Sequence, residues 1–123
     1  MARPLISVII VNYNGRYLLG DCLKSLKKTK LKRSTFEIIV VDNNSRDDSV
    51  AYLKRYFPEI RLIESDKNLG FTGGNNLGYK YAKGKYIALL NSDTKVDPHW
   101  LTELLKAIRK PKVGIVSPKL LYD

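Results

Sequence analysis

The sequence has only one cysteine, Cys22, and one histidine, His99, among its 123 residues. A single cysteine excludes an intramolecular disulfide and a cysteine-based metal site, and it favours a reducing compartment. Leucines surround Cys22 at helical spacing, so we expect its thiol to be a small core group. His99 stands in the first turn of an expected helix, and we interpret it as a surface residue rather than a ligand.

Long apolar runs are also missing from the sequence. None approaches the ~20 residues that a helix needs to cross a bilayer. The apolar run at residues 5–11 is short and β-branched, and polar residues and a glycine follow it instead of the small residues of a signal-peptide cleavage site. We therefore expect a soluble, cytoplasmic chain that forms a single domain over residues 1–123.

Acidic residues are few relative to basic ones. The chain has 12 Asp and Glu against 22 Lys and Arg, a formal net charge of +10, which indicates an anionic partner such as a nucleotide, acidic lipid headgroups or nucleic acid. No nucleic acid is expected, because aromatic residues do not interleave with a basic strand face. The alternative is a generally basic surface, since lysines are spread along the chain and the one dense cluster contains Lys24, Lys27, Lys28, Lys30, Lys32 and Arg33.

Apolar runs of strand length alternate with stretches of helical periodicity along the chain. We expect strands at residues 5–11, 36–41, 60–64, 86–90 and 113–116. The expected helices span about 16–28, a stretch from a capping box at Ser45 and Asp48 to near Pro58, a stretch ending near Ala82, and a stretch from Asp97 (N-cap) and Pro98 to Ile108. This order predicts an α/β fold with right-handed crossovers and a mainly parallel sheet covered by helices on both faces.

Two of the expected strands carry information about their place in the sheet. Residues 86–90 are apolar on both faces, which is typical of an interior strand of a parallel sheet. Residues 60–64 alternate apolar and polar side chains, which favours a more exposed strand at a sheet edge.

Polar residues follow three of the strands, and parallel sheets bind ligands at this carboxyl edge. The polar groups are Asn12 with Asn14, residues 42–45, and residues 91–93. Asp93 suits a Mg²⁺ or Mn²⁺ ion that also touches a phosphate, although Asn-Ser-Asp-Thr is also ordinary turn chemistry. Asp42 either accepts hydrogen bonds from a base or ribose, or holds a strand-to-helix turn.

The glycine-rich segment at residues 68–78 is expected to form a loop and the first turn of the third helix. Glycines there would let the backbone approach a phosphate closely. The segment has neither the G-x-G-x-x-G nor the G-x-x-x-x-G-K-[ST] spacing, which argues against NAD and P-loop chemistry.

These segments, in this order, resemble the N-terminal nucleotide-sugar-binding part of family 2 glycosyltransferases with the Rossmann-like GT-A fold, including rhamnosyltransferase-like members. Residues 7–14 look like the family's first strand, residues 40–45 like its base-binding turn, and residues 68–76 like its central loop. Asn91-Ser92-Asp93 stands at the position of the family's D-x-D metal motif. The resemblance covers essentially the whole chain.

The resemblance implies an inverting glycosyltransferase that binds a UDP- or dTDP-type nucleoside-diphosphate sugar through a Mg²⁺ or Mn²⁺ ion. The sugar would pass to a hydroxyl of a glycan or lipid-linked acceptor in polysaccharide or glycolipid synthesis, with peripheral association at the inner membrane face. Asp93 would bind the metal, Asp42 the base, and Asn91 the ribose or diphosphate. The expected donor-site residues are Asn12, Tyr13, Asn14, Asp42, Asn44, Asn68, Gly73, Asn75, Asn91, Ser92 and Asp93.

Two departures from the family pattern bear on activity. Asn91 stands where many members have aspartate, which lowers the charge of the site, keeps the final carboxylate and bears mainly on donor choice. The family's acidic general base and acceptor surface lie downstream of a strand like residues 113–116, and Glu103 on a helix is no substitute. We therefore expect a donor-binding domain that lacks the acceptor-binding part and an assigned catalytic base. The alternative is a nucleotide-binding module without transferase activity, or a half that needs a partner chain.

Overall fold

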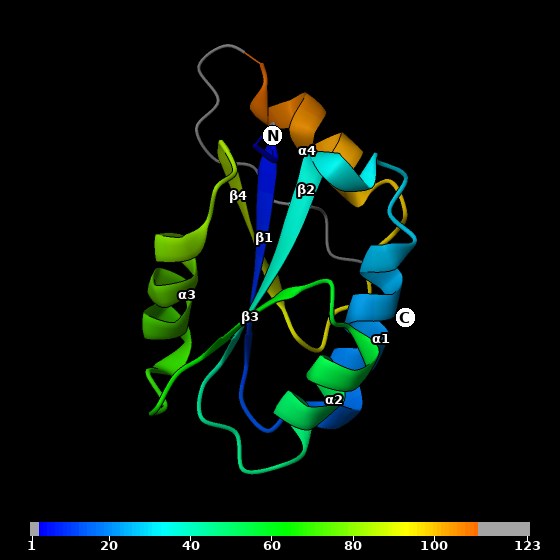
Figure 1. Cartoon of the computed structure of the whole chain (residues 1–123). Helices are drawn as coiled ribbons and strands as arrows, with labels where there is room; N and C mark the ends of the chain where they lie inside the picture. The colour runs from blue at the N-terminus through cyan, green and yellow to red at the C-terminus, as the bar shows by residue number, and fades with distance from the viewer. Residues whose placement is uncertain (1–2, 111–123) are drawn as a thin grey trace.

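The computed structural model describes residues 3–110, which form a four-stranded sheet with helices on both sides (Figure 1). Every strand pairing is parallel, and the strand order is β3-β2-β1-β4. The strands are β1 (Ile6–Asn12), β2 (Phe36–Asp42), β3 (Arg61–Glu64) and β4 (Tyr86–Asn91). The helices are α1 (Arg16–Lys27), α2 (Ser49–Tyr56), α3 (Gly70–Tyr81) and α4 (Trp100–Ile108), with a short 3₁₀ turn η1 (Arg33–Thr35). The predicted α/β class is confirmed, and the expected strand at residues 113–116 lies outside the described residues.

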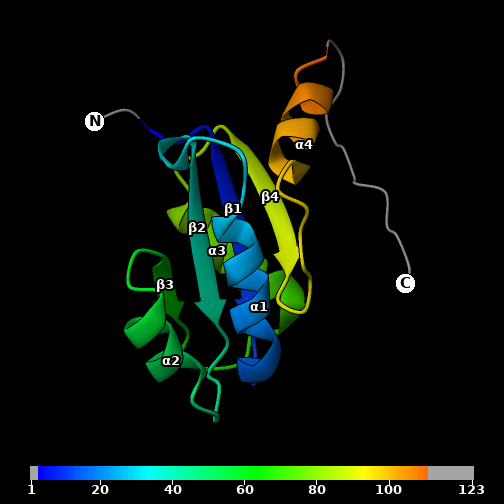
Figure 2. The same ribbon diagram turned by 90° about the vertical axis from the view of Figure 1, so that its right-hand side faces the viewer.

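Two hydrophobic clusters, one on each face of the sheet, separate the helices into layers. Val8 and Ile10 of β1 point to the face covered by α1, α2 and α4, whose buried residues include Leu19, Leu23, Leu53 and Leu101. Ile9, between them in sequence, points to the opposite face, where Leu77 of α3 packs. Figure 2 shows α1 in front of the sheet and α3 behind it. Because both faces are covered, β1 and β2 are almost continuously apolar.

Helix α3 packs very closely against the sheet because the helix face that meets the sheet carries glycines. A Cβ at Gly74 would lie 2.8 Å from Val11 Cγ1, and a Cβ at Gly78 would lie 2.7 Å from Ile9 Cγ2. The prediction that residues 68–78 form a loop and only the first turn of the third helix is therefore wrong, since α3 begins at Gly70. Close packing against β1 offsets the poor helix propensity of glycine.

The two outer strands of the sheet, β3 and β4, lie only in part where their sequence patterns predict. β3 lies at one edge, as its alternating sequence predicts. β4 was expected in the interior, but within residues 3–110 its single neighbour is β1, and Leu89 is 55% exposed.

Two helices begin later than their capping signals predict. Helix α2 begins at Ser49 and not directly after Ser45, because the Ser45 hydroxyl bonds to Asp42 and is not used as a cap. Helix α4 begins at Trp100, because Asp97 Oδ1 accepts a hydrogen bond from the His99 backbone N–H at 2.8 Å. Asp97 therefore closes a turn before the helix, and His99, exposed at its N-terminus, is a surface residue as expected.

Candidate functional site

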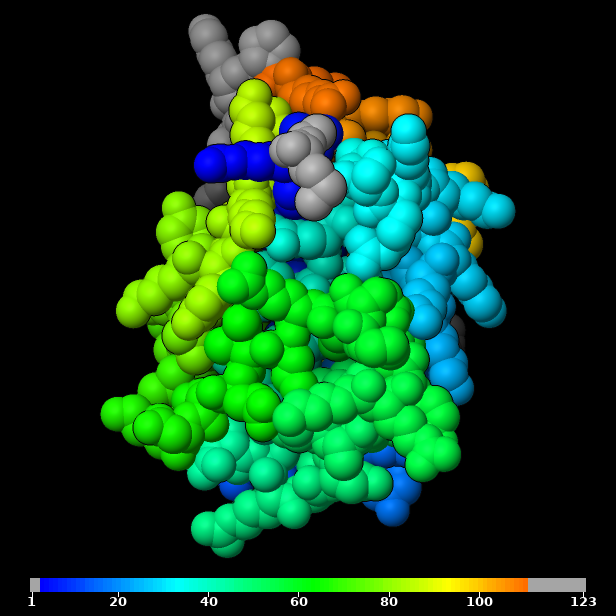
Figure 3. Space-filling view, viewed as in Figure 1, coloured from blue at the N-terminus to red at the C-terminus, as the bar shows by residue number. Residues whose placement is uncertain are grey.

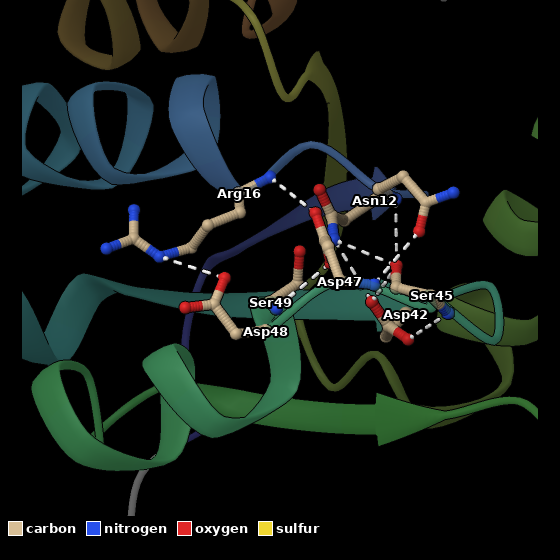
Figure 4. Close-up of polar contacts among 8 residues, drawn as sticks. Asn12, Arg16, Asp42, Ser45, Asp47, Asp48 and Ser49 are labelled. Carbon is tan, nitrogen blue, oxygen red and sulfur yellow. Dashed lines mark hydrogen bonds and ion pairs between the residues drawn. The ribbon is translucent and has the colours of Figure 1, made fainter.

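The polar residues predicted at the carboxyl edge are brought together by the strand register. Asn12 and Asp42 are opposite one another at the ends of β1 and β2, and Val11 pairs with Asn91 at the end of β4. Tyr13 follows β1 and is exposed. Figure 4 shows the side chains of Asn12 and Asp42 and of the turns that follow them. Three strands thus deliver one continuous polar edge.

The centre of this edge is a buried hydrogen-bond network around Asp42, which is 2% exposed. Asp42 Oδ1 accepts hydrogen bonds from Asn12 Nδ2 at 3.0 Å and from the Ser45 hydroxyl at 2.7 Å. Asp42 Oδ2 accepts one from the Ser45 backbone N–H at 2.9 Å. A carboxylate has about four acceptor positions, so one position on Oδ2 is not filled by the described residues. The contacts fit the turn-holding role of Asp42, which the sequence left open beside base binding.

Asn14 and Ser45 join the β1–α1 turn to the β2–α2 turn. The Asn14 backbone N–H donates to the Ser45 hydroxyl at 2.9 Å, and Asn14 Oδ1 accepts from the Arg46 backbone N–H at 2.7 Å. Asn14 and Asn44 both have left-handed backbones, with φ of 52° and 62°, which asparagine tolerates better than most residues. Both had been predicted as donor ligands. In the structure Asn14 shapes and joins the turns, whereas the exposed Asn44 side chain is available to solvent.

Asp47 is a structural residue of the site that sequence reasoning missed. Its Oδ2 accepts from the Arg16 backbone N–H at 3.1 Å, at the start of α1, and its Oδ1 accepts from the Ser49 N–H at 3.0 Å, at the start of α2. Partial burial acts to raise the pKa of Asp47, but the hydrogen bonds from Ser49 and Arg16 and the Arg16 charge outweigh it, so the pKa is lowered. The bond from Ser49 is local, but the bond from Arg16, which ties Asp47 to α1, joins residues 31 positions apart and leaves no local signal in the sequence.

Asn12, whose Nδ2 donates to Asp42, also has a buried amide oxygen. Asn12 Oδ1 has no hydrogen-bond partner within the described chain. A Cβ at Gly15 would lie 2.5 Å from this oxygen and 3.6 Å from the Ser92 hydroxyl, so glycine keeps open the space that Asn12 and Ser92 share. A buried acceptor without a donor is costly unless a ligand or water supplies one. This oxygen is therefore a candidate contact for a bound molecule.

The segment after β4 contains Asp93, the residue that the sequence analysis predicts as the metal ligand. The Thr94 backbone N–H donates to the Asn91 carbonyl at 3.1 Å and closes a turn with Ser92 and Asp93 at its corner. Asn91 and Asp93 are exposed, and Ser92 is half-buried. Asp93 takes part in no ion pair within residues 3–110, so its charge is free to meet a cation.

The remaining predicted residues lie at or on α3. Asn68 Oδ1 accepts from the Gly70 backbone N–H at 2.9 Å and so supports the start of the helix. Gly73 packs against Leu69, and Asn75 is buried on the helix face. Asn43, which was not predicted as a site residue, donates from Nδ2 to the Gly70 carbonyl at 3.0 Å and ties the β2–α2 turn to α3. The hydrogen bonds of Asn43 and Asn68 give these two polar residues a structural role at the start of α3.

The donor atoms present fit a cation that takes most of its ligands from a bound molecule. Among residues 3–110 there is no group of three or more His, Cys, Asp or Glu that could hold a metal ion. Asp93 offers one exposed carboxylate, next to the Asn91 amide and the Ser92 hydroxyl. Mg²⁺ commonly binds one or two carboxylates together with substrate phosphates and water, so the turn suits a metal shared with a phosphate.

The dense basic cluster does not lie at this edge. The segment between α1 and β2 that contains most of it (light blue and cyan in Figure 3) is at the end of the molecule opposite to the β1–α1 and β2–α2 turns. It lies beside the start of α4, where the Lys30 backbone N–H donates to the Pro98 carbonyl at 2.7 Å. No helix in the described part of the chain has the length and apolar character to cross a bilayer.

A parallel α/β sheet with polar turns at its carboxyl edge is the architecture of nucleotide-binding domains. Residues 7–122 match the family described as Glycosyl transferase family 2. The chain belongs to this family of enzymes, and the predicted family resemblance is confirmed.

Curated relatives align with nearly all of the chain. The poly(ribitol-phosphate) beta-glucosyltransferase of Bacillus spizizenii is 37% identical over 119 residues, which cover 94% of this chain and 19% of that protein. The O-antigen biosynthesis protein RfbC of Myxococcus xanthus is 33% identical over 122 residues, which cover 97% of this chain and 10% of that protein. The chain therefore spans only a minor part of the length of these relatives.

Solved structures of GT-A glycosyltransferases share the fold. Staphylococcus aureus TarS 1-349 in complex with UDP matches with a TM-score of 0.77 at 26% identity, covering 84% of this chain and 31% of that one. The mannosyltransferase PcManGT of Pyrobaculum calidifontis, in complex with GDP-Man and Mn²⁺, matches with a TM-score of 0.84 at 24% identity, covering 92% and 34%. The predicted Rossmann-like GT-A fold is confirmed.

Proposed function

We propose that the carboxyl edge of the sheet binds the nucleoside diphosphate of a sugar donor, with Asp93 holding a Mg²⁺ or Mn²⁺ ion against the diphosphate. The observation that carries this proposal is an exposed carboxylate on the turn after β4, free of ion pairs within residues 3–110, in a chain of glycosyltransferase family 2. Family membership supports the reaction class, which is sugar transfer. The exposed turn supports the place where the diphosphate binds.

The nucleoside is assigned to the ends of β1 and β2. The exposed Tyr13 ring offers a stacking surface for a base. The fourth acceptor position of Asp42 is suited to the ring N–H of uracil or thymine, and the buried Asn12 amide oxygen lacks a donor that a ligand could supply. We therefore propose a UDP- or dTDP-type donor, and the UDP-bound TarS structure is consistent with this choice.

The diphosphate is assigned to the Asn91–Asp93 side of the edge. A bound cation would neutralise the negative charge that develops on the leaving nucleoside diphosphate. Asp93 would ligate the cation, and the Asn91 amide and Ser92 hydroxyl would hydrogen-bond to the ribose or the diphosphate. Asn91 in place of a second aspartate leaves the turn with one negative charge, which reduces its repulsion of the diphosphate.

The acceptor step needs groups that residues 3–110 do not supply at this edge. Transfer with inversion to a glycan or lipid-linked hydroxyl, in polysaccharide or glycolipid synthesis, needs a base that is free to take the hydroxyl proton. Asp42 is buried in hydrogen bonds, and Asp93 is assigned to the cation. A positioned base contributes ~10²–10⁴-fold in rate, so we propose donor binding without efficient transfer by this chain alone.

Calorimetric titration of the chain with UDP-, dTDP- and GDP-sugars, with and without Mn²⁺, tests the donor assignment. The expected result is binding of a uracil or thymine nucleotide that tightens when Mn²⁺ is added. Absence of binding to all three classes in a folded sample would refute the proposal. Metal-independent binding would refute the role of Asp93.

A second candidate is a nucleotide-binding module that acts with a partner chain supplying the acceptor half. Within residues 3–110, Asp42 is buried in hydrogen bonds and Asp93 is assigned to the cation, so neither is free as the base, which favours this alternative. Donor turnover with an acceptor separates the two candidates, because only a complete transferase would form product from the chain alone. Product that forms only when a second polypeptide is added would support the module.

The basic cluster supports a separate proposal about location, which is peripheral attachment to an acidic membrane. Lys28, Lys30 and Lys32 form no ion pair within residues 3–110, and their segment lies away from the donor edge. Each basic residue near an anionic bilayer contributes about 1 kcal/mol. Flotation with vesicles containing phosphatidylserine tests this attachment, and equal flotation of a variant with all three lysines changed to glutamine would refute it.

A further inference from the structure

The turn that carries Asp93 rests on the buried thiol of Cys22 in α1. Cys22 is fully buried, and its Sγ donates to the Asn91 carbonyl at 3.7 Å. The same carbonyl accepts the Thr94 backbone N–H at 3.1 Å, which closes the turn. The thiol therefore contacts the turn at the hydrogen bond that defines its shape.

A second side chain of α1 fixes the segment that leaves the turn. The Ser25 hydroxyl donates to the Cys22 carbonyl at 2.7 Å and accepts the Val96 backbone N–H at 3.1 Å. The Lys95–Asp21 pair, at 3.9 Å between largely exposed groups, adds little. Cys22 and Ser25 thus hold both ends of residues 91–96 from a helix about 70 positions earlier in the sequence.

The electrostatics of the thiol agree with this geometry. Burial raises the pKa of Cys22 to about 12, the negative charge of Asp93 acts in the same direction, and a hydrogen bond from the Thr94 backbone opposes them. At neutral pH the thiol is protonated, so it remains a hydrogen-bond donor to Asn91.

We propose that Cys22 and Ser25 are positioning residues that set the direction of Asp93 toward the cation, an inference that rests on the proposed role of Asp93. The support matters because β4 has one strand neighbour, β1, within residues 3–110, and Asn91 and Asp93 are exposed. Groups that orient metal ligands from behind typically affect metal affinity by about 10–100-fold when they are removed. Loss of either contact should weaken metal-dependent binding without changing contacts to the base.

The test is a UDP titration by calorimetry, with and without Mn²⁺, on Ser25→Ala, Cys22→Val and Cys22→Ser. We expect the Mn²⁺-dependent gain in UDP affinity to fall about tenfold in Ser25→Ala and Cys22→Val, with a smaller fall in the Mn²⁺-free affinity, which includes the contacts of Asn91 and Ser92. Cys22→Ser keeps a donor to Asn91 and should retain more of the gain. Ile38→Val, a small deletion in the core of β2, is the matched control for general destabilisation and should retain all of it.

Amide hydrogen exchange gives a reading that does not depend on ligand. In Ser25→Ala the Val96 amide loses its acceptor and should exchange at least tenfold faster, while amides of β1 and β2 keep their protection. If Asp93→Asn abolishes the Mn²⁺ effect but the Cys22 and Ser25 variants keep it in full, the positioning role is overturned and the proposed function stands. If Asp93→Asn itself keeps the Mn²⁺ effect, the proposed function is what fails.

Discussion

Replacing Asp42 distinguishes a carboxylate that holds a turn from one that reads a base. Its two oxygens accept three hydrogen bonds, from Asn12 Nδ2, the Ser45 backbone N–H and the Ser45 hydroxyl. In Asp42→Ala these donors lose their acceptor inside the protein. At ~1–1.5 kcal/mol for each bond, the free energy of unfolding should fall by about 3–5 kcal/mol, a large share of the roughly 5–15 kcal/mol of a typical domain.

Asp42→Asn is the matched variant, because it keeps the size of the side chain and one acceptor oxygen. Its amide nitrogen would face the Ser45 backbone N–H, which lies 2.9 Å from Asp42 Oδ2. One of the three bonds is lost, so at the same ~1–1.5 kcal/mol for each bond we expect the free energy of unfolding to fall by about 1–1.5 kcal/mol. Urea unfolding followed by the fluorescence of Trp100, the single tryptophan, measures both variants.

Ligand affinity then separates the two roles in samples that are still folded. If Asp42 also accepts the ring N–H of the base, Asp42→Asn should weaken UDP by about 1.5–3 kcal/mol and leave ribose 5-phosphate unaffected. Equal weakening of both ligands would assign Asp42 to the turn alone. A urea midpoint of Asp42→Asn equal to that of the parent would refute the reasoning that the carboxylate is committed to the turn.

Three further perturbations follow from the site and its packing. Asp93→Asn should abolish Mn²⁺-dependent UDP binding at an unchanged urea midpoint, and calorimetry showing full Mn²⁺ dependence would contradict the assignment. Gly74→Ala should lower the free energy of unfolding in urea by up to about 2 kcal/mol, because a Cβ 2.8 Å from Val11 overpacks the interface by ~1–3 kcal/mol while alanine regains ~1 kcal/mol of helix propensity. A more stable variant would show that α3 can shift. Because the folded-state pKa of Asp47 is lowered, its stabilisation is complete above about pH 4 and is lost as the pH falls through that lowered pKa. The parent should therefore lose more stability below about pH 4 than Asp47→Asn, and parallel pH profiles in urea unfolding would show otherwise.

The order of strands and helices could be predicted because each element carries its own signal. β1 and β2 are apolar on both faces, and α1 and α4 carry apolar residues at helical spacing. Helix α3 carries the opposite local signal, because glycines at 70, 73, 74 and 78 disfavour a helix. What stabilises α3 is contact with Val11 and Ile9, about 60–70 positions earlier, which no local pattern can report.

The candidate site shows the same division between local and distant causes. The convergence of Asn12, Asp42 and Asn91 follows from parallel pairing alone, so the sequence predicts it. Ser45 has capping-box spacing, yet its hydroxyl bonds to Asp42 and accepts the Asn14 N–H, because the neighbouring turn offers better-placed partners than the helix start. A capping motif predicts only the hydrogen bonds that a side chain can form within its own segment. It cannot predict that Asn14, which follows another strand, competes for the Ser45 hydroxyl.

The bonds between the β1–α1 and β2–α2 turns have a consequence for the thermodynamics of ligand binding. Asn14 bonds to Ser45 and Arg46, and Asp47 bonds to Arg16, so the protein's own groups hold both turns. Ordering a mobile side chain on binding costs about 0.5–1.5 kcal/mol. In these turns the side chains are ordered when the protein folds, so binding does not have to order them. A nucleoside that binds against them therefore meets a preorganised wall and loses little affinity to entropy. The turn after β4 is held in a comparable way, by hydrogen bonds with Cys22 and Ser25 of α1.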